Sequence, residues 1–122
     1  MEALFDKGRS FAVGPVKAFY MISPASSTQS VEPVIAAFSV PSKIFKRAVD
    51  RNELKRRMRE VYRQNKEIVR NAAIGAKLQC FVMFIYIAKN KLPYSEIESK
   101  LLVTLHHLRK KIEYEESINN AD

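Results

Sequence analysis

Cysteine, glycine and long apolar runs are scarce in this 122-residue chain. Cys80 is the only cysteine, so no disulfide can form within the chain, and a reducing cytoplasm is the expected compartment. The main apolar run, residues 80–88, is too short to cross a bilayer as a helix, which takes about 20 residues. The first residues include Glu2 and Asp6 and show no signal-peptide pattern. We therefore expect a soluble cytoplasmic protein.

The residue patterns of protein-borne catalysis are also missing. The chain has no glycine-rich phosphate loop, no nucleophile elbow and no Cys/His metal spacing. Nucleolytic metal sites need clustered carboxylates, whereas the acidic residues here are scattered or lie near the C-terminus. His106 and His107 are adjacent, so on a helix they would diverge by about 100° and could not share a metal ion. We expect both histidines at the surface, and neither a catalytic residue nor a metal site in the protein.

Positive charge is what the chain has in excess, and it is concentrated in one segment. Lys and Arg outnumber Asp and Glu by 21 to 13, which gives a net charge of +8 and a pI near 9.7. Residues 43–63 carry nine of these cations against Asp50, Glu53 and Glu60, a local charge of +6 (nine minus three). A concentrated basic helix in a compact domain is typical of a polyphosphate partner, above all nucleic acid.

The basic segment has the periodicity of a helix with two different faces. A mostly apolar stripe suited to packing on a sheet repeats at spacings of three and four through Leu54, Met58, Val61, Tyr62, Asn65, Ile68 and Val69. A separate cationic ladder at a spacing of four consists of Arg51, Lys55, Arg59 and Arg63. We expect Asp50 and Glu53 to form a capping arrangement at the helix start, and Gly75 to mark the exit.

The rest of the chain predicts an α+β domain over residues 1–112, followed by a frayed acidic tail over 113–122. The expected elements are a short helix before Gly8, strands over 10–23 and 34–40, the basic helix, a central strand over 80–88 covered on both faces, and a helix opening at 93–95. Alternatively, the hairpin formed by the strands over 10–23 and 34–40 is divided into three strands. In the first strand, Lys17 and Phe19 alternate with the apolar face that holds Ala18.

The basic segment also carries a specific motif. Residues 48–60 read Ala-Val-Asp-Arg-Asn-Glu-Leu-Lys-Arg-Arg-Met-Arg-Glu and follow Phe38-Ser39-Val40. This string resembles the protein component of bacterial ribonuclease P, whose basic helix has the pattern Ala-Val-x-Arg-Asn-x-x-Lys-Arg-x-x-Arg. Further agreement comes from Leu4-Phe5, Gly8-Arg9-Ser10, Ile87-Ala88-Lys89, Tyr94 and Glu96. Glu53 and Arg57 depart from the family, where these positions are often basic and apolar respectively.

The resemblance implies a fold and a function. The family fold is a two-layer α+β sandwich: a mostly antiparallel four-stranded sheet, three helices, and a left-handed β-α-β crossover containing the basic helix, as in the second domain of a small-subunit ribosomal protein. Ribonuclease P, the enzyme to which this family belongs, removes the 5′ leader from precursor tRNA. Its catalytic RNA subunit with bound Mg²⁺ carries out the chemistry. The protein binds ribonuclease P RNA through the basic helix and the leader in a cleft on the sheet. The family's first helix usually begins further upstream, so here it looks cut short at Met1.

Candidate site residues follow from the charge pattern and the resemblance together. For binding the RNA subunit we predict Lys43, Lys46, Arg47, Arg51, Asn52, Lys55, Arg56, Arg59 and Arg63. For the leader cleft we predict Phe5, Lys17, Phe19 and Lys89, since aromatic faces stack on any base while a cation follows the backbone. A strand aromatic is more often a core residue, which is the alternative for Phe19. The amide of Asn52 could bond a nucleotide edge or could hold Arg51 in place.

Three other classes of protein share a basic helix. A ribosome-type RNA-binding protein would have the helix but no turnover, and it is the main alternative. A DNA-binding module could read bases with Arg and Asn, but it would need a dimerisation device, and no sustained heptad is present. A calmodulin-type target helix would be separable, whereas this helix has a core-facing stripe. We therefore expect ribonuclease P RNA and precursor tRNA as partners, and neither DNA nor a membrane.

Overall fold

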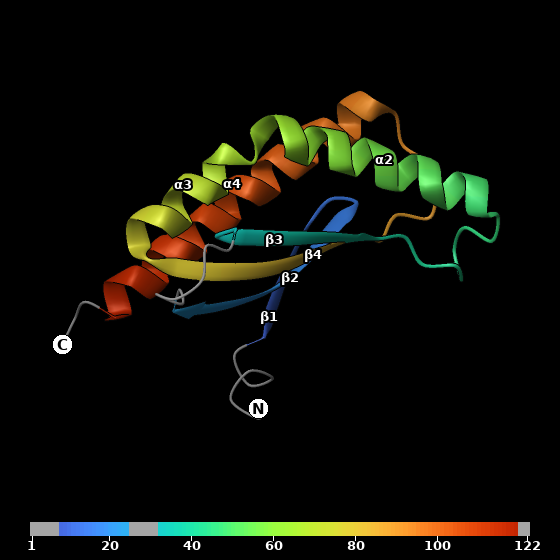
Figure 1. The fold of residues 1–122 in the computed structure, drawn as a ribbon. Helices are drawn as coiled ribbons and strands as arrows, with labels where there is room; N and C mark the ends of the chain where they lie inside the picture. Colours follow the sequence, from blue (N-terminus) through green and yellow to red (C-terminus); the bar gives the residue numbers. More distant parts are fainter. Residues whose placement is uncertain (1–7, 25–31, 120–122) are drawn as a thin grey trace.

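The computed structural model describes residues 8–24 and 32–119, which form two layers (Figure 1). A sheet makes one layer, and the helices lie together on one side of it. In chain order the elements are β1 (Arg9–Val13), β2 (Val16–Pro24), β3 (Val34–Ser39), α2 (Ala48–Asn65), α3 (Glu67–Ala76), β4 (Leu78–Tyr86) and α4 (Tyr94–Asn119). The predicted α+β sandwich is confirmed. The short helix expected before Gly8 lies outside the described residues.

The four strands are ordered β1-β2-β4-β3, so β1 and β3 are the edges of the sheet. β1 pairs with β2 and β2 with β4 in antiparallel fashion, whereas β3 and β4 are parallel. A parallel pair requires a crossover connection, and here α2 and α3 supply it. The basic helix therefore lies in a β-α-β unit beside β3, as the resemblance implied.

The alternation along β2 and β4 separates a buried face from an open one. The buried residues of the two strands are Val16, Ala18, Tyr20, Ile22, Leu78, Cys80, Val82, Phe84 and Tyr86. They pack against the helices, whereas Phe81 and Met83 on the other face are 42% and 41% exposed. Our expectation that the central strand is covered on both faces is therefore wrong for the described residues, because α2, α3 and α4 all lie on the same side (Figure 1).

A hairpin turn divides the segment that we predicted as one strand over 10–23. Gly14 has φ +56°, which glycine adopts without steric cost, and Pro15 cannot donate to the strand ladder. Val13 consequently pairs with Val16, and the chain turns back on itself. The alternative of three strands before the basic helix is the one confirmed.

The start of α2 differs from the predicted capping arrangement. Arg47 is the N-cap, and its side chain makes no capping hydrogen bond. Asp50 lies in the first turn, where its charge still favours the helix dipole. Lys43 and Lys46 precede the helix, so the basic segment begins in the loop after β3.

The ends of the later helices also differ from expectation. The basic helix is interrupted at Lys66, which separates α2 from α3. α3 ends at Ala76, and its C-cap is Lys77, which has φ 59° and donates its N–H to the carbonyls of Ala73 and Ile74, so Gly75 is not the exit residue. α4 continues to Asn119 where we predicted a frayed tail from residue 113.

Candidate RNA-binding surface

The nine residues predicted to bind RNA all lie on α2 or in the loop that precedes it. Seven of them are exposed, namely Lys43, Lys46, Arg47, Asn52, Arg56, Arg59 and Arg63. Arg51 and Lys55 are half-buried. The opposite side of α2 buries Leu54, Met58 and Val61 in the core, which confirms the two-sided helix. This anchoring fixes the direction in which the cations point.

Arg51 has a structural task within this surface. Its Nη1 donates hydrogen bonds to the backbone oxygens of Phe45 and Lys46, both at 2.8 Å. Since Phe45 is buried, this contact holds the loop before α2 against the body of the protein. The side chain of Asn52 makes no hydrogen bond to any residue that the structure describes, so a role in holding Arg51 is not seen. Asn52 is instead exposed to solvent, next to Arg51 in the first half of α2.

Ion pairs neutralise part of the cationic face and leave the rest available. Arg47 contacts Asp50 at 2.9 Å, and Arg63 contacts Glu60 at 2.6 Å. The hydrogen bond from Arg63 lowers the pKa of Glu60, which therefore stays charged. Within the described part of the chain, Arg56 and Arg59 have no acidic partner within 4 Å. These two guanidinium groups are the accessible cations at the middle of α2.

An ion network that the sequence did not predict joins α2 to the loop after β4. Lys91 Nζ lies 3.1 Å from Asp50 Oδ1 and 2.8 Å from Glu53 Oε1. Arg57 bonds Glu53 at 2.6 Å and donates to the backbone oxygen of Leu92 at 2.7 Å. The sequence signal was the pair of departures Glu53 and Arg57, but their partners are too distant in the chain to infer. The network fixes the loop that carries Lys89 relative to the RNA-binding helix.

We expect acidification to release Lys91 from α2, while the hydrogen bond from Arg57 to the Leu92 carbonyl remains. A hydrogen bond from Arg47 lowers the pKa of Asp50, and one from Lys91 lowers the pKa of Glu53. Folded-state values below those of the unfolded chain mean that the contacts are present at neutral pH and are lost as the pH falls through the lowered values. The backbone amide shifts of Lys89 and Lys91 should therefore change together below the ordinary carboxyl range of about 4.

Two variants separate this release of Lys91 from general acid unfolding. Lys91→Ala should abolish the joint titration of the loop amides at a pH where the core signals are unchanged. Lys110→Ala removes another exposed lysine, which lies on α4, and should leave the titration as it was. Loop amides that titrate identically in the Lys91→Ala variant would contradict the assignment.

Of the four residues predicted for the leader cleft, the open face of the sheet carries Lys17 and Phe19. Lys17 and Phe19 point to this face from β2, and Phe19 is 43% exposed, so its alternative role as a core residue is excluded. Lys89 is exposed just after β4, and Phe5 lies outside the described residues. An apolar hollow of about 200 Å³ is lined by Phe19, Met21, Ile35, Ala37, Phe81, Val82 and Met83. Sequence reasoning missed the contributions of β3 and β4, because it assumed that the central strand was covered.

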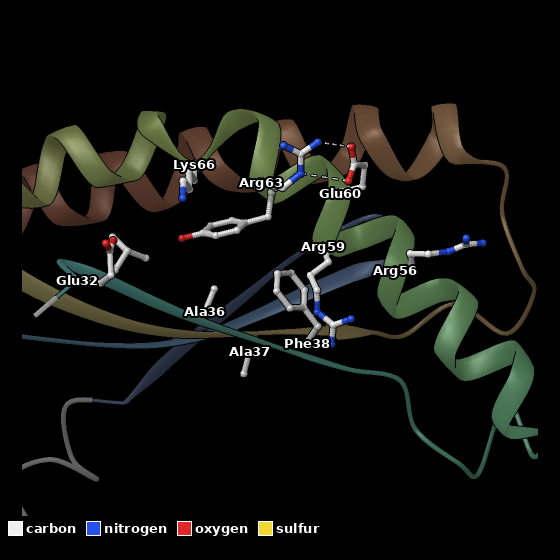
Figure 2. A pocket seen from close by; sticks show the side chains of 11 residues that line it. Glu32, Ala36, Ala37, Phe38, Arg56, Arg59, Glu60, Arg63 and Lys66 are labelled. Atoms are coloured by element: carbon white, nitrogen blue, oxygen red, sulfur yellow. Dashed lines mark hydrogen bonds and ion pairs between the residues drawn. The ribbon is translucent and has the colours of Figure 1, made fainter.

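A larger groove runs between the edge strand β3 and helix α2, and we call it the β3–α2 groove (Figure 2). Its volume is about 810 Å³. It is lined by Glu32, Val34, Ala36, Ala37, Phe38, Arg56, Arg59, Glu60, Tyr62, Arg63 and Lys66. Arg59 lies over the ring of Phe38, with 5.6 Å between Cζ and the ring centroid. The groove therefore combines cations, two carboxylates and an aromatic platform.

The comparison with known families decides what this surface belongs to. A sequence model of the family described as Ribonuclease P matches residues 2–113. The chain belongs to the ribonuclease P protein family. Its relatives include the ribonuclease P protein component of Porphyromonas gingivalis W83, 27% identical over 105 residues that cover 86% of this chain and 74% of the relative. The corresponding protein of Chlorobium phaeobacteroides is 31% identical over 117 residues, covering 89% and 80%.

Solved structures carry the same fold. The RNase P protein from Thermotoga maritima superposes with a TM-score of 0.64 at 20% identity, covering 87% of this chain and 88% of that one. The Staphylococcus aureus RNase P protein gives a TM-score of 0.61 at 20% identity, covering 85% and 84%. The mixed four-stranded sheet with its helices is thus the fold of bacterial ribonuclease P proteins.

Membership of the ribonuclease P family establishes a role in tRNA processing and a partnership with ribonuclease P RNA. His106 and His107 are both exposed, as predicted. In residues 8–24 and 32–119, no three His, Cys, Asp or Glu side chains are grouped so that they could hold a metal ion. Over the same ranges, no helix has the length and hydrophobicity of a membrane span.

Proposed function

We propose that this chain binds ribonuclease P RNA through α2 and the 5′ leader of precursor tRNA on the open face of the sheet. It thereby assists RNA-catalysed, Mg²⁺-dependent removal of the leader in the cytoplasm. The observation that carries the proposal is the cationic face of α2, in which Arg56 and Arg59 are exposed while Leu54 and Met58 anchor the helix in the core. Family membership supports the identity of the RNA partner.

The α2 surface is suited to a phosphate backbone. Arginine presents a planar fork that matches phosphate oxygens and can also stack on a base. Arg56 and Arg59 are three residues apart, so both reach the same side of the helix. Each contact releases counterions from the RNA, and the affinity should therefore fall steeply as salt rises.

The open face of the sheet is suited to a strand of variable sequence. The exposed ring of Phe19 and the apolar hollow beside it offer stacking, which every base can accept. Lys17 precedes Phe19 by two residues on the same face of β2, where its ammonium group can follow the leader phosphates. Lys89 extends this positive charge from the loop after β4.

The chemistry itself is proposed to belong to the RNA. Mg²⁺ held by the RNA would activate the nucleophile and stabilise the leaving oxygen. The protein contributes positive charge that offsets phosphate repulsion between the RNA subunit and its substrate, so less Mg²⁺ is needed for assembly.

Reconstitution tests the proposal directly. Precursor-tRNA cleavage is followed at low Mg²⁺ with ribonuclease P RNA alone, with the protein alone, and with both together. We expect cleavage only in the combined reaction, and we expect the RNA alone to recover activity at high Mg²⁺. Binding of the RNA without stimulation of cleavage would favour a purely structural RNA-binding protein and overturn the proposed role.

Replacing Phe19 with Ala should weaken the binding of precursor tRNA by roughly 5- to 150-fold, the range expected for one stacked base. The assembled enzyme is titrated with precursor tRNA and with mature tRNA, which lacks the leader. The mature tRNA serves as the control, because its affinity should be unaffected. An equal loss for both substrates would mean that Phe19 does not contact the leader.

A further inference from the structure

We propose that the β3–α2 groove binds one unpaired nucleotide of ribonuclease P RNA, with the base stacked on the guanidinium of Arg59. This inference rests on the proposed function, since it assumes that α2 faces the RNA. It adds a specific kind of contact: a base removed from its helix and held in a groove, in addition to phosphates along the helix.

The stacking platform is built from the core outward. Phe84 is fully buried, and the ring of Phe38 stacks on it with 5.5 Å between centroids and 24° between planes. The guanidinium of Arg59 lies over Phe38 at 5.6 Å, and the arginine is exposed to solvent (Figure 2). Three flat groups are therefore arranged from the core to the surface. Unpaired RNA bases stack on aromatic rings and on arginine planes, so a base would continue this series.

The groove has the polar groups that a nucleotide requires. Arg56 and Lys66 lie at its two ends (Figure 2), separated by about 15 Å along the helix at 1.5 Å per residue. Phosphates of the strand that enters and leaves the groove could therefore each approach a cation. The carboxylate of Glu32 pairs through Oε1 with Arg70 at 3.3 Å, and since its side chain is 62% exposed, Oε2 could accept a hydrogen bond from a base amino group. A volume of about 810 Å³ is within the usual range for ligand sites.

Tyr62 offers a hydrogen bond that the protein does not use. Its ring lines the groove and packs edge-on against Phe38 at 5.8 Å. Among the described residues its hydroxyl has no hydrogen-bond partner. Burial raises the pKa of Tyr62 to about 12, so the hydroxyl is protonated at neutral pH and can donate. A base or a ribose hydroxyl in the groove could accept this hydrogen bond.

Two conservative variants distinguish stacking from charge. Arg59→Lys keeps the positive charge but removes the flat surface, and we expect it to weaken binding of ribonuclease P RNA about ten-fold, within the range for a stacked base. Arg56→Lys makes the same chemical change one turn away, where no aromatic ring lies beneath the guanidinium in the described part of the chain. We expect a clearly smaller loss for that variant.

Two further variants test occupancy of the groove without altering charge. Ala36→Leu fills the groove, because Ala36 points toward the helices while Ala37 points away (Figure 2). Tyr62→Phe removes only the hydroxyl and should cost about three- to ten-fold in affinity. Ala12→Leu enlarges an exposed alanine on the other edge strand and serves as the control for Ala36→Leu. Thermal unfolding of each variant confirms that it is folded before its affinity is compared.

Chemical probing of the RNA supplies the decisive readout. Dimethyl sulfate modifies unpaired adenine and cytosine, and 2′-hydroxyl acylation reports any flexible nucleotide. In the complex with the wild-type protein, one unpaired nucleotide should be protected, and the same nucleotide should become reactive again with Arg59→Lys and with Ala36→Leu. Equal affinities for Arg59→Lys and Arg56→Lys, with no nucleotide changing its reactivity, would overturn the groove proposal. Loss of the proposed function would instead appear as unchanged RNA affinity when Arg56 and Arg59 are both replaced with Ala.

Discussion

Replacing Arg56 and Arg59 together with Ala is expected to weaken binding of ribonuclease P RNA about 30-fold at physiological salt. Both side chains are exposed and have no acidic partner within 4 Å in the described residues, so RNA phosphates do not compete with an ion pair in the protein. A charge-assisted contact at an exposed site contributes on the order of 1 kcal/mol, and two of them give this factor. Filter binding over a range of salt concentrations measures the loss.

The salt dependence of the affinity provides a second, independent test of whether Arg56 and Arg59 contact phosphates. Each lost phosphate contact should reduce the slope of log affinity against log salt by roughly 0.7 to 0.9, so the double variant should lose about 1.5. The control is a variant in which Lys110 and Lys111 are replaced by Ala. It has the same net charge as the Arg56/Arg59 variant, but the two cations that it lacks lie on α4. We expect its affinity to change less than about two-fold. Equal losses for the two proteins would mean that only the overall charge matters and that α2 is not the contact.

Replacing Phe84 with Ala is expected to destabilise the fold by about 3–5 kcal/mol, the usual cost of removing a fully buried aromatic ring. Phe84 lies on the central strand β4, has no exposed surface, and contacts both Phe38 and Tyr62 at centroid distances of 5.5 and 5.9 Å. The loss is a large part of the 5–15 kcal/mol typical of such a domain. Urea unfolding monitored by circular dichroism measures it.

Phe81 provides the matched control on the same strand. It is three residues away but points to the open face, where it is 42% exposed. Replacing it with Ala should cost less than about 1 kcal/mol, because little packing is lost. The comparison also tests the direction in which β4 faces, since a fully covered central strand would give similar costs at both positions.

The character of α2 follows from short-range patterns, and sequence reasoning recovered it. The apolar stripe through Leu54, Met58 and Val61 is buried, and the cations predicted to bind RNA lie on the helix or just before it. The alternation that set Phe19 apart from Ala18 is likewise confirmed. A helix repeats every 3.6 residues and a strand every two, so neighbours in the sequence are enough to assign a residue to a face.

The environment of each face depends on contacts that sequence spacing does not encode. Whether the face of β4 that carries Phe81 and Met83 is covered depends on where α2, α3 and α4 pack. All three helices pack on the opposite face of the sheet. The turn at Gly14 changed one predicted strand into two, because a positive φ was compatible with pairing of Val13 and Val16.

The sequence by itself determined the class of fold, the two-sided basic helix and, through the Arg51-Asn52 motif and its spacing, the ribonuclease P family. Only the tertiary structure placed Arg59 over Phe38 and brought Lys91 to Glu53. Those pairs are 21 and 38 residues apart in the chain (59 minus 38, and 91 minus 53). They meet because the crossover lays α2 alongside β3 and because the loop after β4 returns to the start of α2, which is decided by strand order and helix packing.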